Sequence, residues 1–313
     1  MSRREFLLLA GGGAMAAVAV ACTGGGKSGS VTGPAAKNSI DALSQGATEL
    51  SLIQAQSEMP AGRSLFTFGL STQDGKLVEG GSPKVFVAQD QSTPASGPFP
   101  ATWYQFAAAS KFNDNGKIPR SALKGFYSAE VDLPDPGSWF FAGVAQIGGA
   151  KGVGVGATTV KTSVIAAVGS RAVSVRTPVA TTEAKARQIC TREPPDPMHS
   201  ISLDAALRNG KPTVVSFATP LLCQSQLCGP VTDEVLLAFQ KYGKDRANFV
   251  HVEEFLPGPD HKPDASQLSP GFKAWGLTTE PWVFVIDKHG VIRARMQGPT
   301  TQPMIDLALK PLL

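Results

Sequence analysis

The distribution of apolar residues differs between the two halves of the chain. Between about residues 50 and 175, short segments alternate apolar and polar positions, which is the period of a strand with one buried face. The clearest of these expected strands are 64–70, 84–88, 125–131 and 139–145. Many short strands separated by turns are typical of an antiparallel sandwich. We therefore expect an all-β domain over residues 49–175.

A different pattern begins near residue 201. The segments 213–217, 248–252 and 282–286 are apolar almost throughout, as in strands buried on both faces. A turn signal at residues 287–290 predicts a hairpin to a further strand, 291–296. The expected helices between and after these strands are 203–208, 229–242, 272–275 and 302–309. The order β, α, β, α, β, β, α predicts an α/β domain over residues 201–313.

The connections between these regions are rich in proline or in small polar residues. Residues 176–200 include Glu-Pro-Pro-Asp-Pro at 193–197, and consecutive prolines disfavour both helix and sheet. We expect a linker there and a flexible tether over residues 22–48. The turn at residues 133–139 resembles the corner before a late strand of immunoglobulin-like domains. The predicted fold is therefore multidomain: an immunoglobulin-like sandwich followed by the α/β domain.

The first 22 residues carry the features of an export signal. Arg3 and Arg4 precede an apolar stretch that ends near residue 21, and this start resembles a twin-arginine signal. The stretch is shorter and richer in glycine than a membrane-spanning helix, which needs about 20 strongly apolar residues. Residues 19–22 resemble a bacterial lipobox, so we expect a signal peptide over residues 1–21 and a lipid anchor on Cys22. An ordinary cleavable signal, with Cys22 incidental, is the alternative.

Composition and charge exclude several classes of function. The formal net charge is only +4 over 313 residues, and no basic cluster suggests that the chain binds nucleic acid. A hydrophobic content of 42% and a charged content of 17% describe a globular chain rather than a disordered one. The expected location is the extracytoplasmic face of the cell membrane, where disulfides can form and persist.

Three cysteines remain if Cys22 carries lipid: Cys190, Cys223 and Cys228. An odd number means that at least one thiol is free or only transiently paired. We interpret Cys190 as an incidental free thiol of the linker, or as an occasional partner of the other two. The count also excludes a zinc site made of four cysteines.

The residues around the other two cysteines resemble the thioredoxin superfamily. The strand 213–217 leads into a loop with Cys223, and Cys228-Gly229-Pro230 repeats the start of the thioredoxin motif Cys-Gly-Pro-Cys. The stretch 275–290 resembles the segment in which thioredoxins place a cis-proline, here Pro281, before a core strand. The resemblance is to the TlpA/ResA type of extracytoplasmic thioredoxin-like protein.

This resemblance implies a redox-active cysteine pair beside the cis-proline. It also implies that four residues near the pair contact the substrate: Glu280, Pro281, Gly229 and Pro230. Glu280 is also a candidate for proton transfer, and a solvated loop acid is the alternative interpretation of it.

The cysteine spacing departs from the family pattern. Val231 occupies the position of the usual second cysteine, and the partner of Cys228 is Cys223, which gives C-x4-C. A cysteine at a helix N-terminus has a lowered pKa, because it faces unpaired N–H groups and the positive end of the helix dipole. We therefore predict that Cys228 is the nucleophile and Cys223 the resolving thiol. Counting from the end of the strand favours the reverse assignment.

Three functions are compatible with these features. The first is a thiol–disulfide oxidoreductase that acts on exported thiol-containing proteins or receives electrons from a membrane donor. The second is a non-catalytic cell-surface binding protein in which the bridge is structural. The third is copper handling, with His261 as the only plausible third ligand beside the two cysteines. We expect no cofactor and no bound metal in the first case.

Overall fold

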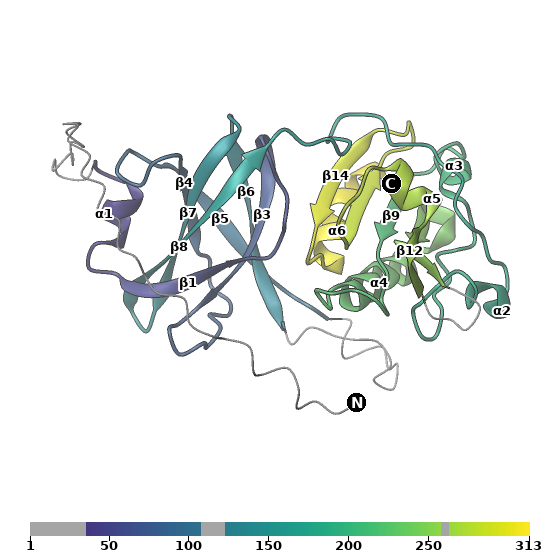
Figure 1. Ribbon diagram of the computed structural model, residues 1–313, viewed down its shortest axis with the longest axis horizontal. Helices are drawn as coiled ribbons and strands as arrows, with labels where there is room; N and C mark the ends of the chain where they lie inside the picture. Colours follow the sequence, from purple (N-terminus) through teal and green to yellow (C-terminus); the bar gives the residue numbers. More distant parts are fainter. Residues whose placement is uncertain (1–35, 108–122, 258–262) are drawn as a thin grey trace, which may run out of the picture. The chain divides into compact units, whose positions relative to one another are not determined.

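The computed structural model describes residues 36–107, 123–257 and 263–313 (Figure 1). Within these ranges, no helix has both the length and the apolar content needed to cross a membrane. The proposed signal residues, Cys22 and His261 lie outside the described residues.

The β-rich region forms one closed sheet. Seven strands follow one another around it in the order β1-β3-β6-β5-β4-β7-β8, and a parallel pairing of β8 with β1 closes the ring. Short β2 (Met59–Pro60) also pairs with β8. The seven strands are β1 (Thr48–Gln54), β3 (Gly62–Ser71), β4 (Lys84–Ala88), β5 (Ser96–Gln105), β6 (Gly125–Leu133), β7 (Gly137–Ile147) and β8 (Ala150–Lys161). The expectation of an all-β region is confirmed, but the immunoglobulin-like sandwich is wrong, because the strands form a barrel instead of two packed sheets.

Glycines at the seam explain the closure. Gly152, Gly154 and Gly156 lie on β8 where it faces β1, and a side chain at any of them would crowd leucines of β1 or β3. A Cβ atom on Gly152 would lie 2.9 Å from Leu50, and one on Gly154 would lie 3.0 Å from Leu70. The closed sheet has no free edges there, which removes a site of unwanted strand pairing.

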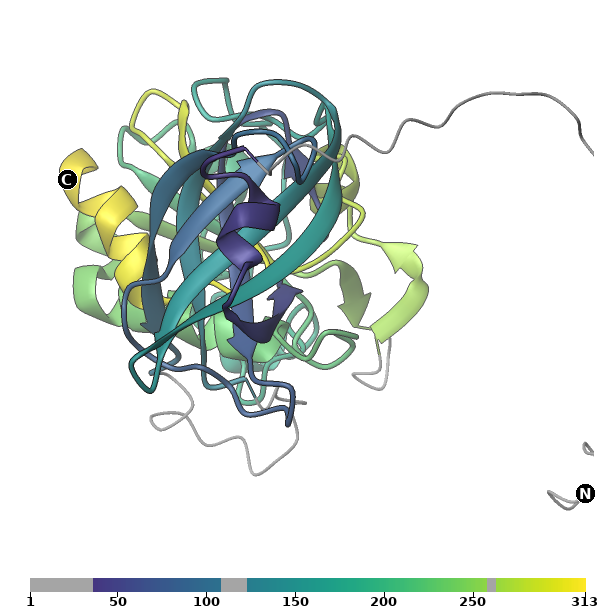
Figure 2. The same ribbon diagram turned by 90° about the vertical axis from the view of Figure 1, so that its left-hand side faces the viewer.

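The barrel interior holds the alternating apolar residues that the sequence pattern predicted. Phe66, Phe68 and Leu70 lie two residues apart on β3 and have no exposed surface. Helix α1 (Ile40–Ser44) packs on β4, β7 and β8, and Ile40 is fully buried there (Figure 2). Folded structure therefore begins within the range expected to be a tether.

The α/β domain has a four-stranded mixed sheet in the order β10-β9-β13-β14. Strand β9 (Thr213–Phe217) is parallel to β10 (Asn248–Val252) and antiparallel to β13 (Trp282–Ile286), which pairs with β14 (Ile292–Gln297). The helices are α3 (Leu203–Ala206), α4 (Cys228–Arg246), α5 (Pro270–Ala274) and α6 (Gln302–Leu309). A β-α-β unit followed by an antiparallel hairpin and a last helix is the thioredoxin-like fold that the sequence predicted.

Both faces of this sheet are covered, which explains why its strands are apolar throughout. Val214 packs with residues of α4 and α6, whereas its neighbour Val215 packs with residues of α3 and α5. Successive side chains of a strand point to opposite faces, so each face needs its own apolar set. Gly243, the expected end of the long helix, is a kink with φ 69° that separates the last turn of α4.

Much of the segment expected to be a linker is buried. It contains the one-turn helix α2 (Glu183–Ala186), and Cys190, Asp196 and His199 are each at most 3% exposed. The backbone N–H of His251 in β10 donates to the carbonyl of Met198 at 2.9 Å. The small β11 (Phe255–Pro257) and β12 (Pro263–Leu268) form a separate two-stranded sheet.

Candidate active site

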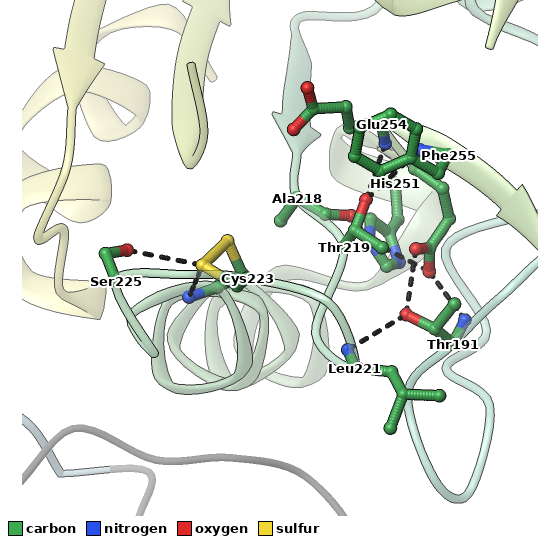
Figure 3. Close-up of a disulfide and its surroundings, with 11 residues drawn as sticks. Thr191, Ala218, Thr219, Leu221, Cys223, Ser225, His251, Glu254 and Phe255 are labelled. Atoms are coloured by element: carbon green, nitrogen blue, oxygen red, sulfur yellow. Dashed lines mark hydrogen bonds and ion pairs between the residues drawn. A yellow bond between two sulfur atoms is a disulfide. The ribbon is translucent and has the colours of Figure 1, made fainter. Parts of the chain in front are cut away.

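Cys223 and Cys228 form a disulfide at the start of α4 (Figure 3). Their Cα atoms are 5.8 Å apart. Cys228 is the first residue of the helix and is fully buried, whereas Cys223 lies in the loop after β9 and is 5% exposed. The structure thus brings together the two cysteines that the sequence paired.

Two successive turns allow the unusual C-x4-C spacing. The carbonyl of Thr219 accepts hydrogen bonds from the N–H groups of Leu222 and Cys223, both at 3.1 Å. The carbonyl of Cys223 then accepts one from Gln226, whose φ of 57° is left-handed. The loop therefore turns back on itself, so that Cys223 reaches the residue that opens the helix.

The Cys223 sulfur lies where negative charge is stabilised. The N–H of Cys228 donates to Cys223 Sγ at 3.3 Å, and Ser225 Oγ lies 3.2 Å from the same sulfur (Figure 3). This N–H belongs to the first turn of a 19-residue helix, where unpaired N–H groups and the helix dipole favour an anion. Such contacts lower the pKa of a thiol once the bridge is reduced.

The side chain of Glu280 adjoins the bridge. One of its carboxylate oxygens and the two sulfur atoms all lie within 4.8 Å of one another. Burial raises the pKa of Glu280 to about 8, and the nearby carboxyl groups of Glu254 and Glu253 add to this effect, while hydrogen bonds with Thr219 oppose it. Among the described residues, Oε2 of Glu280 has no hydrogen-bond partner. Glu280 is therefore mostly protonated at neutral pH. Beside the bridge, its protonated form can give a proton and its ionised form can take one.

The remaining predicted site residues lie around this corner. The peptide bond between Glu280 and Pro281 is cis, as the resemblance implied. Gly229 and Pro230 are buried in the first turn of α4, and Pro281 is buried just before β13. Substrate contact by these residues stays a prediction.

Val231 occupies the position at which the thioredoxin motif has its second cysteine. Its side chain is fully buried in the core beneath α4, together with Val214 and Val283. The partner sulfur of Cys228 comes instead from Cys223 in the preceding loop.

A second group of polar side chains lies deep in the same domain, and the sequence analysis did not assign it. Cys190 is a free, buried thiol, and its Sγ lies 3.3 Å from Asp196 Oδ2 and 3.9 Å from His251 Nδ1. His199 packs against His251 with ring centroids 4.9 Å apart. The short spacing from Cys190 to Asp196 and His199 was the available signal, but His261 was the only histidine considered as a ligand from the sequence.

Comparisons with known proteins add little to this description. No protein-family model matches the sequence, and no curated protein matches it. Among solved structures, the chain is similar to a thiol:disulfide interchange protein of the thioredoxin family from Chlorobium tepidum TLS. The identity is 22%, the match covers 36% of this chain and 85% of that chain, and the TM-score is 0.27. The fold assignment made above rests on strand order and direction, not on this likeness.

Proposed function

We propose that the chain is a thiol–disulfide oxidoreductase whose reacting groups are Cys223, Cys228 and Glu280. The observation that carries this proposal is the position of the Glu280 carboxyl beside both sulfur atoms, with its pKa raised to about 8. Thiol–disulfide exchange needs a proton donor or acceptor next to the sulfur that leaves or attacks. A bridge that only stabilises the fold needs no such neighbour.

Cys223 is the attacking thiol in this proposal, in place of the Cys228 expected from the sequence. Its sulfur accepts the N–H of Cys228, and Cys223 as a residue is 5% exposed whereas Cys228 is fully buried. The helix N-terminus therefore acts on the sulfur of the preceding loop instead of on the first helical residue. Cys228, which is fully buried beside Glu280, serves as the resolving thiol.

The reaction exchanges two electrons and two protons between the pair and a partner. In one direction, the Cys223 thiolate attacks a partner disulfide, which forms a mixed disulfide and releases one partner thiolate. Solvent returns to this thiolate the proton that Cys223 gave up. Glu280 as carboxylate then accepts the proton of Cys228, whose sulfur attacks Cys223 and releases the second partner thiolate, and this thiolate receives the proton from Glu280. In the reverse direction, a partner thiolate attacks Cys223, and protonated Glu280 gives its proton to the departing Cys228 sulfur. A second partner thiolate then attacks the partner sulfur of the mixed disulfide, which forms the partner disulfide and releases Cys223 as a thiolate. Both directions balance without a further cofactor.

The proposed setting is the extracytoplasmic face of a membrane. The support comes from the sequence: the twin arginines Arg3 and Arg4, the apolar stretch after them and the lipobox-like residues before Cys22. We propose lipid attachment at Cys22, exported thiol-containing proteins as substrates, and a membrane donor as a possible electron source. The TlpA/ResA type of thioredoxin-like protein is the group that these features fit best.

A redox titration of the pair tests the proposed activity. The Cys22→Ser protein is equilibrated in glutathione or dithiothreitol buffers, and the fraction of bridged protein is measured by alkylation and mass spectrometry. A potential between about −270 and −120 mV is expected, since this is the range of exchanging pairs. A potential far below about −300 mV would mark the bridge as structural and favour the binding-protein alternative.

A further inference from the structure

Four side chains that differ in chemistry converge in the buried part of the α/β domain. Three come from residues 190–199 and one from β10, and all are at most 3% exposed. One potential ligand atom from each lies within 4.8 Å of all the others. The four residues are Cys190, Asp196, His199 and His251.

Two separations between these atoms match tetrahedral coordination, and two others are within 1 Å of it. Metal–ligand bonds of about 2.0–2.3 Å at tetrahedral angles place the ligand atoms about 3.3–3.7 Å from one another. Asp196 Oδ2 lies 3.3 Å from Cys190 Sγ and 3.7 Å from His199 Nε2. Cys190 Sγ lies 3.9 Å from His251 Nδ1. The shortest separation, 2.8 Å between Asp196 Oδ2 and His251 Nδ1, needs to lengthen by less than 1 Å.

His199 supplies an independent sign that the cluster holds a ligand. Its Nε2 atom is buried and, among the described residues, has no hydrogen-bond partner. A buried polar atom without a partner costs about 1–3 kcal/mol, so native proteins rarely leave one unexplained. Asp196 Oδ2 lies 3.7 Å from this nitrogen, too far for a hydrogen bond, so the atom adjoins the cluster without being bonded within it.

The groups around the cluster orient the ligand atoms. The other ring nitrogen of His251, Nε2, lies 2.9 Å from the carbonyl of Ala218 (Figure 3). Donation by an Nε2–H group to this carbonyl leaves Nδ1 unprotonated and facing the cluster, as in metal-bound histidines. The second oxygen of Asp196 accepts the N–H of Met198 at 2.9 Å, which fixes the carboxylate.

The charges also match a divalent cation. A thiolate and a carboxylate together carry two negative charges, and two neutral imidazoles add none. This sum neutralises a dication in a site from which water is excluded. The combination of sulfur, imidazole and carboxylate donors suits Zn2+, and a site with four protein ligands and no open position is structural, not catalytic.

We propose that the α/β domain binds one structural Zn2+ ion through four side chains: Cys190, Asp196, His199 and His251. The ion fastens residues 190–199 to strand β10. The site is separate from the disulfide, and the proposal does not depend on the redox function. Because the ligands are buried, the metal enters as the domain folds.

Cobalt spectroscopy on oxidised protein tests the site directly. The starting protein carries Cys22→Ser and keeps the Cys223–Cys228 bridge, so Cys190 is its single reduced thiol. The protein is produced in cobalt-supplemented medium and purified without chelator. We expect one Co2+ per chain, a thiolate-to-cobalt charge-transfer band and the d–d bands of tetrahedral Co2+. All of these should be lost when the protein is unfolded and refolded with Zn2+ in place of Co2+. Folded protein that binds no metal, or that binds Co2+ without the charge-transfer band, would overturn the proposal.

Matched variants locate the ion. Cys190→Ser is expected to remove the charge-transfer band, and His199→Gln to weaken Zn2+ binding by more than about 100-fold, since losing an outer partner already costs about 10- to 100-fold. His289→Gln is the control, because His289 is exposed. The Cys223→Ser/Cys228→Ser double variant should keep the band. A band that survives Cys190→Ser, or a His199→Gln variant that binds as tightly as the control, would contradict the assignment.

Discussion

The two cysteine sites of the α/β domain are close together, but one favours the thiolate form of its cysteine and the other favours the neutral thiol. Ala218 connects them: its side chain packs with Cys223 and Cys228, and its carbonyl lies 2.9 Å from the Nε2 atom of His251. At the helix start, the N–H of Cys228 donates to the Cys223 sulfur, which stabilises a thiolate there. In the interior, burial, with a smaller contribution from Asp196, raises the pKa of the Cys190 thiol to about 12.

This difference shows that position, not residue type, determines the chemistry of a cysteine. Without a cation, the Cys190 thiol stays protonated and unreactive, because its surroundings disfavour charge. A partner molecule can approach the loop before α4, since Leu222, Gln224 and Ser225 are exposed there. We therefore expect exchange chemistry at one site and a structural role at the other.

Removing the thiols of one site at a time tests whether only the Cys223–Cys228 site carries out exchange. Cys223→Ser or Cys228→Ser should abolish catalysed reduction of a model disulfide, because each leaves the exchange without one of its two sulfurs. Cys190→Ser should keep the catalysed rate, provided that circular dichroism shows a folded protein. Stopped-flow or plate assays of disulfide reduction measure these rates. Loss of the rate in folded Cys190→Ser protein would show that the two sites are not separate.

Glu280→Gln should slow the cleavage of the bridge by an external thiol by about 100-fold, the lower range for a general acid. In the wild-type protein, the rate per thiolate should fall as the pH rises through about 8, because Glu280 loses the proton that Cys228 needs. The groups that face Glu280 are Glu254, Glu253 and the hydroxyl and backbone of Thr219.

Glu254→Gln is the matched control for this pH dependence. It removes a negative charge that raises the pKa of Glu280, so the inflection should move to lower pH while the plateau rate remains. Rates measured from pH 5 to 10 give both inflections. A pH profile that is the same in Glu280→Gln as in the wild-type protein would rule out a role for this carboxyl in proton transfer.

The same carboxyl should also make stability depend on pH. The pKa of Glu280 is raised from 4.5 to about 8 in the folded chain, so the unfolded chain loses this proton at lower pH than the folded one. Between about pH 5 and 8 the unfolded state therefore binds fewer protons, and the free energy of unfolding falls as the pH rises. Between pH 5 and pH 9, the free energy of unfolding of the wild-type protein should therefore fall relative to that of Glu280→Gln by about 2–4 kcal/mol.

Urea denaturation at the two pH values measures this effect. Glu49→Gln is the control, since Glu49 lies exposed on β1. A pH dependence that Glu280→Gln leaves unchanged would mean that Glu280 is ionised in the folded protein at neutral pH.

Reduction of the bridge should have the smallest effect. The two cysteines are five positions apart, and in the chain-entropy model a loop of this length stabilises the fold by about 2 kcal/mol. Urea denaturation with and without reductant should show a loss of about this size. The Cys223→Ala/Cys228→Ala double variant should not respond to reductant. Complete unfolding on reduction would instead identify a structural bridge.

The sequence predicted the α/β domain well because its signals are local. The strands 213–217, 248–252 and 282–286 are observed with the expected bounds, since each is an apolar run between turn residues. The barrel was harder to predict. Strand β8 is rich in glycine, which lowers strand propensity, yet those glycines are what allow it to close against β1.

The two cysteine sites also differ in how far the sequence could predict them. Cys223 and Cys228 were paired from sequence because they lie in one short loop beside a recognisable motif. The interior cluster joins residues 190–199 to His251 in a strand, and only the folded sheet places them side by side. The raised pKa of Glu280 likewise depends on burial in the folded domain and, to a smaller extent, on Glu254 and Glu253, which come from a distant segment.

Mapping a trapped mixed disulfide tests the central claim most directly. Reduced Cys228→Ser protein, also carrying Cys22→Ser, is mixed with glutathione disulfide, quenched with acid and digested for mass spectrometry. The account predicts one glutathione on Cys223 and none on Cys190. No adduct on Cys223, or an adduct on Cys190 in the folded protein, would contradict it.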